Sequence, residues 1–205
     1  MKIVKLSLLA FISVWVVSCS WGDDWDETQD QILTIAYKSP EADFSQYRTF
    51  AVADSMTVVI NGEKERVQND ESMKIYNQVV HNLTGLGYTQ VSVSENPNLL
   101  ADLSYIRSTN TTIYPGYWSD WGWWWDTVGY PWYPWSTYYP YPMPSIISTY
   151  TTGTLIIELA DVTKAREQNV PIVWHGVVRS ILNGTHTEAQ ITDAINEVFT
   201  ILPPK

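Results

Sequence analysis

The sequence is poor in cysteine, histidine and basic residues. Its single cysteine, Cys19, excludes an intrachain disulfide. Twelve Lys and Arg stand against 22 Asp and Glu, so the formal net charge is −10. Such an acidic surface repels nucleic-acid backbones, and no basic stripe offsets it. The three histidines, His81, His175 and His186, lack metal-ligand spacing. We therefore expect neither nucleic-acid binding nor a metal site.

The motifs of common enzymes are also missing. The sequence contains no Gly-rich phosphate loop, nucleophile elbow or paired-cysteine motif. We therefore expect no cofactor and a non-catalytic protein. The alternative is a hydrolase-type enzyme in which Asp102, Glu158, Asp161 and His175 converge on one sheet face for acid-base chemistry. The simpler interpretation is that strand alternation places these polar residues on a solvated face.

The N-terminal residues 1–18 have the pattern of a signal peptide. Lys2 and Lys5 precede an apolar run, Leu6–Val17, that is too short to span a bilayer comfortably. The run ends in Val16-Val17-Ser18-Cys19, which resembles the lipobox of bacterial lipoproteins, in which the cysteine is lipidated and becomes the first residue. The alternative is an ordinary secretory signal or a membrane anchor with an incidental cysteine. We expect Cys19 to hold the protein in a membrane.

Residues 19–30 are predicted to form an acidic tether. Their acids, glycine and isolated tryptophans show neither helical nor strand periodicity. The acids also resemble the signal that exports Bacteroidetes lipoproteins to the outer face of the outer membrane, although a merely solvating linker explains them equally well. We expect an outer-membrane location in a Gram-negative bacterium, on either its periplasmic or its surface face.

Residues 31–205 are predicted to form a single α+β domain. A hairpin of two strands, Gly153–Asp161 and Ile172–Val178, is expected at the centre of its sheet. Four further segments are strongly patterned: strands at Ile32–Tyr37, Tyr47–Val52, Gly87–Val93 and Leu99–Ile106. Asn61-Gly62 predicts a second hairpin, a small solvent-facing ribbon of residues 58–67.

Two amphipathic helices complete the predicted domain. One begins at Asp70 and is stopped by Gly85 and Gly87, and the other follows a capping pair of Thr187 and Gln190. The fold class is therefore a two-layer α+β sandwich, with a mostly antiparallel sheet of about five to six strands and both helices on one face. Its core is expected to include Leu155, Ile157, Trp174, Ile191, Ile195 and Val198.

Several segments together resemble one protein family. They are Asp43–Phe50, Gly87-Tyr88, Ala101–Leu103, Gly153–Asp161, Ile172–Gly176 and Leu202–Lys205. Their order and spacing resemble the DUF4136 lipoproteins of Bacteroidetes and other Gram-negative bacteria. The resemblance implies a lipid-anchored envelope domain of unassigned function and supplies no catalytic residues. The polar turn at residues 163–169 is longer than the resemblance predicts.

The long insertion at residues 109–148 is the most unusual segment. Between Tyr114 and Tyr141, 14 of 28 residues are Tyr or Trp. These rings carry on the order of 2,000 Å² of surface, several times what a soluble monomer exposes as one patch. The tract either folds back on the sheet as a lid, or it binds a glycan, an envelope protein or the membrane interface. The candidate binding residues are Trp118, Trp121, Trp123, Trp124, Trp125, Tyr130, Trp132 and Trp135.

Two short patterns resemble the O-glycosylation acceptor of Bacteroidetes. They are Asp54-Ser55-Met56 and Asp126-Thr127-Val128, and both fall in predicted loops. Ser55 and Thr127 are therefore candidate modification sites. Taken together, the sequence predicts a lipid-anchored envelope protein whose aromatic insertion binds or scaffolds a partner.

Overall fold

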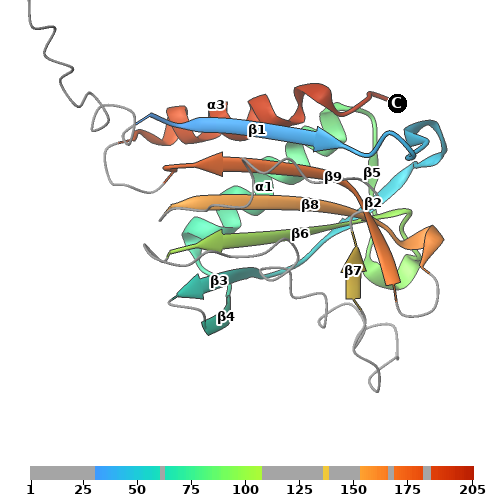
Figure 1. The fold of residues 1–205 in the computed structure, drawn as a ribbon, viewed down its shortest axis with the longest axis horizontal. Helices are drawn as coiled ribbons and strands as arrows, with labels where there is room; N and C mark the ends of the chain where they lie inside the picture. The colour runs from blue at the N-terminus through green and yellow to red at the C-terminus, as the bar shows by residue number, and fades with distance from the viewer. Residues whose placement is uncertain (1–30, 61–62, 108–135, 139–152, 166–168, 182–185) are drawn as a thin grey trace, which may run out of the picture.

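The structure, a computed structural model, describes residues 31–60, 63–107, 136–138, 153–165, 169–181 and 186–205. Within them the chain forms one mixed sheet with two α-helices, α1 (Asp70–Gly85) and α3 (Glu188–Val198), packed on one face (Figure 1). The α+β class predicted from the sequence is confirmed.

The sheet has the strand order β1-β9-β8-β6-β2-β5. These strands are β1 (Leu33–Lys38), β9 (Asn169–Arg179), β8 (Thr154–Asp161), β6 (Leu99–Ile106), β2 (Thr49–Val52) and β5 (Thr89–Gln90). β8 and β9 form the predicted hairpin and lie inside the sheet, as expected. β5 is shorter than predicted, because the chain enters it through Gly87 at φ +92° and leaves it for the 3-10 turn Val93–Glu95.

The outer edge of β6 is shared by two strands that follow one another along the chain. β2 pairs with its first half and β3 (Met56–Ile60) with its second half, and both run parallel to it. The sheet is therefore more mixed than the mostly antiparallel arrangement expected. β3 also pairs with β4 (Glu63–Val67) as the predicted hairpin. The expected solvent exposure of this ribbon holds for β4, which is largely exposed, and is wrong for β3, which pairing with β6 buries.

Both helices begin at side-chain caps. Thr187 and Gln190 form the predicted capping box of α3, and Asn69 and Ser72 form an equivalent box at α1. These caps satisfy amide groups that a helix leaves without intrahelical partners. Each helix then presents an apolar stripe to the sheet.

The main core lies between the helices and the sheet. It contains all the predicted residues: Leu155, Ile157, Trp174, Ile195 and Val198 are buried, and Ile191 packs partly buried against them. The Trp174 ring stacks on Phe199 with centroids 4.9 Å apart. Gly176 lies beneath that ring, and a Cβ there would overlap Trp174 Cη2. The absence of a side chain at Gly176 makes room for the indole.

Candidate functional site

A line of polar residues crosses the sheet on the face opposite the helices. Asp102 of β6 is paired with Glu158 of β8, Glu158 with His175 of β9, and His175 with Tyr37 of β1. Side chains alternate between the faces of a strand, and Ile157, next to Glu158, belongs to the core under the helices. The polar line therefore lies on the other face. We call Asp102, Glu158 and His175, together with Arg66, the polar row.

The central contact of the polar row joins Glu158 and His175. His175 Nδ1 lies 3.3 Å from Glu158 Oε1, and the two side chains are 0% and 1% exposed. The contact becomes an ion pair when the imidazole is protonated. A buried carboxylate beside an imidazole is an arrangement that can hold or transfer a proton.

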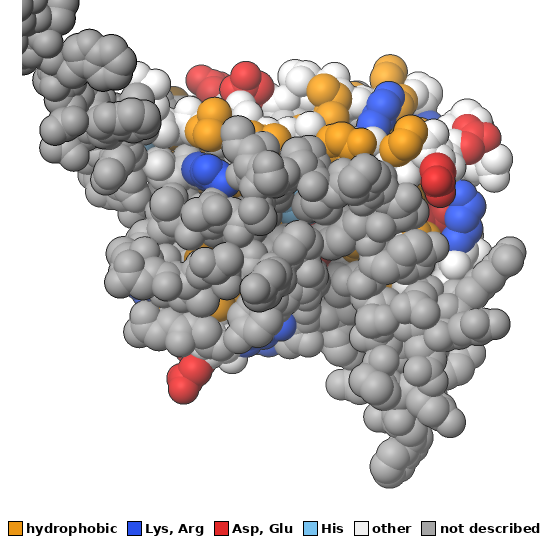
Figure 2. Space-filling view, in the orientation of Figure 1, with side chains coloured by type: hydrophobic (Ala, Val, Ile, Leu, Met, Phe, Trp, Pro, Cys, Tyr) orange, Lys and Arg blue, Asp and Glu red, His pale blue; other side chains and the backbone are white. Residues whose placement is uncertain are grey.

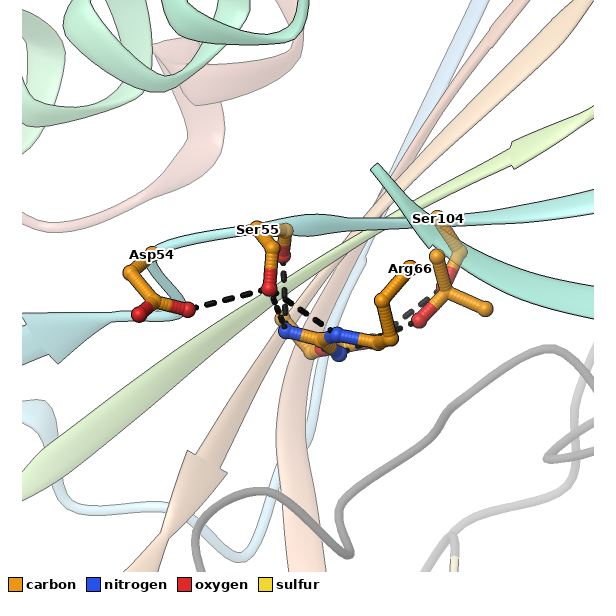
Figure 3. Close-up of polar contacts among 6 residues, drawn as sticks. Asp54, Ser55, Arg66 and Ser104 are labelled. Atoms are coloured by element: carbon orange, nitrogen blue, oxygen red, sulfur yellow. Dashed lines mark hydrogen bonds and ion pairs between the residues drawn. The ribbon is translucent and has the colours of Figure 1, made fainter. Parts of the chain in front are cut away.

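Arg66 of β4 forms the other end of the polar row. Its Nη1 lies 3.7 Å from Asp102 Oδ1 and donates a hydrogen bond to Thr57 Oγ1 at 3.2 Å. Ser104 Oγ donates to Asp102 Oδ2 at 3.1 Å. Figure 3 shows the guanidinium held against Ser55, whose hydroxyl accepts from Arg66 Nε and Nη2 at 3.0 and 2.8 Å. The guanidinium is thus fixed by several bonds beside a buried carboxylate.

The polar row places two carboxylates directly opposite one another. Asp102 and Glu158 are register partners on adjacent antiparallel strands, where like charges repel. Arg66 lies on the far side of Asp102, and His175 on the far side of Glu158. Each carboxylate therefore has its own cationic or potentially cationic neighbour, which offsets the repulsion.

Asp161 does not join the polar row, contrary to the hypothesis of four converging residues. It lies at the end of β8, beyond a register shift between Leu159 and Ala160. There it accepts a hydrogen bond from Tyr47 Oη at 2.7 Å and contacts Lys164 Nζ at 3.5 Å. Burial and this bond raise the pKa of Tyr47 well above its ordinary value. Asp161 therefore makes structural contacts that are separate from the polar row.

Comparison with known protein families assigns the chain to one of them. A family profile described as a domain of unknown function, DUF4136, matches residues 35–204. The chain belongs to the DUF4136 family. The resemblance seen in the sequence is thereby confirmed. No curated protein matches the chain.

A solved DUF4136 structure shares the fold. It is a DUF4136 family protein from Bacteroides thetaiotaomicron, 24% identical, with a TM-score of 0.60, over 83% of this chain and 95% of that one. A PDZ domain protein from Parabacteroides distasonis is 12% identical with a TM-score of 0.40, over 84% of this chain and 36% of that one. The first likeness supports the DUF4136 fold and no particular activity.

Several predicted sites of this DUF4136 chain lie outside the described residues. These are Cys19, Thr127 and the eight Trp and Tyr residues of the aromatic tract. Ser55 is described: it lies in the bend between β2 and β3, and its hydroxyl also donates to Asp54 at 3.0 Å. A glycan on Ser55 would compete with its bonds to Arg66.

The described ends of the aromatic insertion are fixed on neighbouring strands. Ile106 of β6 is paired with Thr154 of β8, and Gly153 N donates to Ile106 O at 2.9 Å. Inside the insertion, residues 136–138 form a short strand, β7 (Ser136–Tyr138), parallel to the start of β9. We did not predict this strand, because three residues among prolines give no periodic signal.

Three of the cavities lie on the helix side, away from the polar row. One, of about 360 Å³, is lined by β3, β4, β6 and the starts of both helices and opens to solvent. A second, of about 660 Å³, runs between α1 and α3 and includes His81, and a third, of about 290 Å³, lies at the C-terminal ends of both helices. In the view of Figure 2, acidic, basic and hydrophobic side chains are interspersed along the upper edge, where β1 and α3 lie in Figure 1.

Two further findings concern metal and membrane. Among the described residues, no three His, Cys, Asp or Glu side chains lie close enough to hold a metal ion. No helix in the described part of the chain has the length and apolar character needed to cross a membrane.

Proposed function

We propose that this DUF4136 protein is a lipid-anchored envelope protein that binds a partner through its aromatic insertion. The observation that carries the proposal is the pairing of Ile106 with Thr154 at the two ends of the insertion. The insertion thus starts and finishes at one place on a well-packed sheet. A rigid scaffold that presents a long loop is a common arrangement for binding.

The composition of the insertion suggests the kind of partner. Trp and Tyr supply large rigid contact areas and are enriched in binding surfaces and at membrane interfaces. Seven tryptophans and seven tyrosines occur within residues 114–141. A glycan stacked on the rings or a protein of the envelope would use this surface. The acidic net charge disfavours partners that are themselves strongly anionic.

The proposal is tested by removing the rings without shortening the chain. Trp118, Trp121, Trp123, Trp124 and Trp125 are replaced by Ser, and envelope glycans and proteins are captured with both forms. The partner should be lost while the circular dichroism spectrum and melting temperature change little. A control replaces Trp174, a core residue, by Phe and should retain the partner. Retention of every partner by the five-fold variant contradicts the proposal.

A deletion separates binding from folding. Replacing residues 114–133 by a short Gly-Ser link leaves β7 in place, and loop-closure entropy changes slowly with length. The shortened protein should fold and lose its partner. Failure to fold would mean that the tract belongs to the core and acts as a lid.

The anchor is tested by Cys19→Ala. Several acyl chains, at roughly 0.8 kcal/mol per buried CH₂, hold a protein far more firmly than one chain. The variant should leave the membrane fraction after a carbonate wash, while the wild type stays. A variant that still pellets with membranes contradicts the lipoprotein assignment.

The polar row favours a second candidate, a hydrolase-type acid-base site formed by Asp102, Glu158 and His175. Their adjacency in the sheet is the supporting observation. Their exposure of 1% or less argues against direct access by a substrate. The test compares the wild type with His175→Gln across ester, glycoside and peptide substrates. Hydrolysis that disappears in the variant supports this candidate, and its absence from the wild type counts against it.

A further inference from the structure

The helix-side cavity lined by β3, β4 and β6 contains charges of both signs and a buried tyrosine. Glu65 and Val67 on β4 face the helices, because their neighbour Arg66 faces the polar row. Glu71 of α1 and Arg107, the residue after β6, complete the charged lining. Its volume of about 360 Å³ lies in the range of small-molecule sites.

The charged groups of this cavity are not used by the fold. Glu65, Glu71 and Arg107 form no side-chain ion pair or hydrogen bond with any described residue, although they line one cavity. Exposed charges elsewhere do pair, as Lys74 and Glu188 do at 3.0 Å. The cavity lining therefore includes one cation and two carboxylates that no described side chain pairs with.

Two less exposed polar groups in the cavity are also without partners. Tyr105 is 6% exposed, and its hydroxyl makes no hydrogen bond to the described chain, so it is free to bond a molecule in the cavity. His186 Nε2 is buried and has no hydrogen-bond partner there either. Burial raises the pKa of Tyr105 to about 12, and Glu71 adds to this rise while Arg107 opposes it. The phenol thus remains a donor at neutral pH and senses both charges.

We propose that this cavity binds a small zwitterion with an apolar side chain, namely an α-amino acid or a short peptide. Arg107 would receive the carboxylate, and Glu65 and Glu71 the ammonium group. Tyr105 would donate its hydroxyl to the carboxylate. The apolar wall, which includes Val58 and Ile191, would contact the side chain. An anion alone or a cation alone would leave one set of charges unused.

Isothermal titration calorimetry on the purified full-length protein tests the proposal. The probes are L-leucine, the dipeptide L-leucyl-L-leucine, 4-methylpentanoate, which lacks the amine, and 3-methylbutylamine, which lacks the carboxylate. Leucine or the dipeptide should bind at least about tenfold more tightly than either single-charge analogue. Comparing the affinities for leucine and for the dipeptide shows whether a free amino acid or a peptide is preferred.

Charge variants assign the two ends of the ligand. Arg107→Gln should weaken zwitterion binding roughly 10- to 100-fold and leave 3-methylbutylamine unaffected. The double variant Glu65→Gln, Glu71→Gln should weaken the zwitterion similarly and spare 4-methylpentanoate. Lys38→Gln and Glu41→Gln change exposed charges away from the cavity and serve as controls. All the varied side chains are exposed, so the fold should be retained.

Three outcomes would overturn the proposal. The first is that neither leucine nor the dipeptide binds at millimolar concentration. The second is that a single-charge analogue binds as tightly as the zwitterion. The third is that the cavity variants bind the zwitterion as well as the two controls do.

Discussion

The sheet face under α1 and α3 is mostly apolar, whereas the opposite face carries the polar row between two small apolar clusters. One cluster includes Leu100 and Ile172, and the other includes Ile106 and Val177. The same strands supply both faces: in β8, Ile157 packs under the helices and Glu158 belongs to the polar row. The difference in polarity between the two faces therefore arises from the alternation of side chains along each strand.

The difference assigns separate roles to the two faces. Burial of apolar area under the helices supplies most of the stabilisation. A buried ionic row contributes less net free energy, because desolvation offsets much of the attraction. It does fix register, since a shift of one residue in β8 would place Glu158 among the core side chains under the helices. One face stabilises the fold, and the other selects its strand pairing.

The largest expected loss of stability comes from a substitution that creates a cavity on the apolar face. Ile157→Ala removes a fully buried side chain and should lower the free energy of unfolding by roughly 2 to 5 kcal/mol. Urea denaturation measures it. Ile157→Val is the matched control and should cost only about 0.5 to 1.5 kcal/mol. Unchanged stability of Ile157→Ala would remove the energetic distinction between the faces.

The next effect concerns the polar row itself. Asp102→Asn keeps the shape of the side chain but leaves Arg66 without its carboxylate, so unfolding should become easier by roughly 2 kcal/mol. A double-mutant cycle with Arg66→Met isolates the coupling between the pair. If Asp102→Asn instead stabilises the protein, repulsion between Asp102 and Glu158 outweighs attraction to Arg66.

A loss of similar size is expected from filling space beside Trp174. Gly176→Ala places a methyl group against the indole and should destabilise by roughly 1 to 3 kcal/mol. Trp174→Phe removes the contacting atom, so this change should cost less when it is made in the Gly176→Ala variant than in the wild type. Strictly additive losses in thermal unfolding would show that the contact is not the cause.

Local patterns in the sequence account for most of the apolar face. The periodicity of the two helices, the Thr187 cap and the alternation around Ile157 each depend on residues close in the chain. The contact of Glu158 with His175 also follows from the β8–β9 hairpin. These features could be predicted because short-range spacing determines them.

Pairings between distant segments could not be predicted in the same way. Arg66 reaches Asp102 because β3 and β6 pair in parallel, and no local pattern indicates that pairing. The displacement of Asp161 from the polar row follows from a bulge after Leu159. The charges around Tyr105 come from three separate elements. Each of these contacts depends on which distant strands pair and in what register, and the alternation of residues within one strand does not determine that.

The tyrosines on the apolar face predict a loss of stability at high pH. Burial raises the pKa of Tyr88 and of Tyr105 to about 12, whereas an unfolded tyrosine titrates near 10. Between these values the unfolded chain binds fewer protons, so stability falls as pH rises. Each residue should account for roughly 1 to 2 kcal/mol between pH 10 and 12. Denaturation of Tyr88→Phe and Tyr105→Phe should show a shallower decline, and an equal slope would contradict this account.

The smallest effect is expected on the outer surface of the helix layer, where Lys74 and Glu188 join α1 to α3. Their side chains are 63% and 74% exposed, in contrast to the buried carboxylate of Asp102. Exposed pairs are screened by water and salt, so Lys74→Ala should change the free energy of unfolding by less than about 1 kcal/mol. Raising the salt concentration should shrink this difference further, whereas the effect of Asp102→Asn should persist. A Lys74→Ala loss as large as that of Asp102→Asn would mean that burial does not set the strength of ion pairs in this fold.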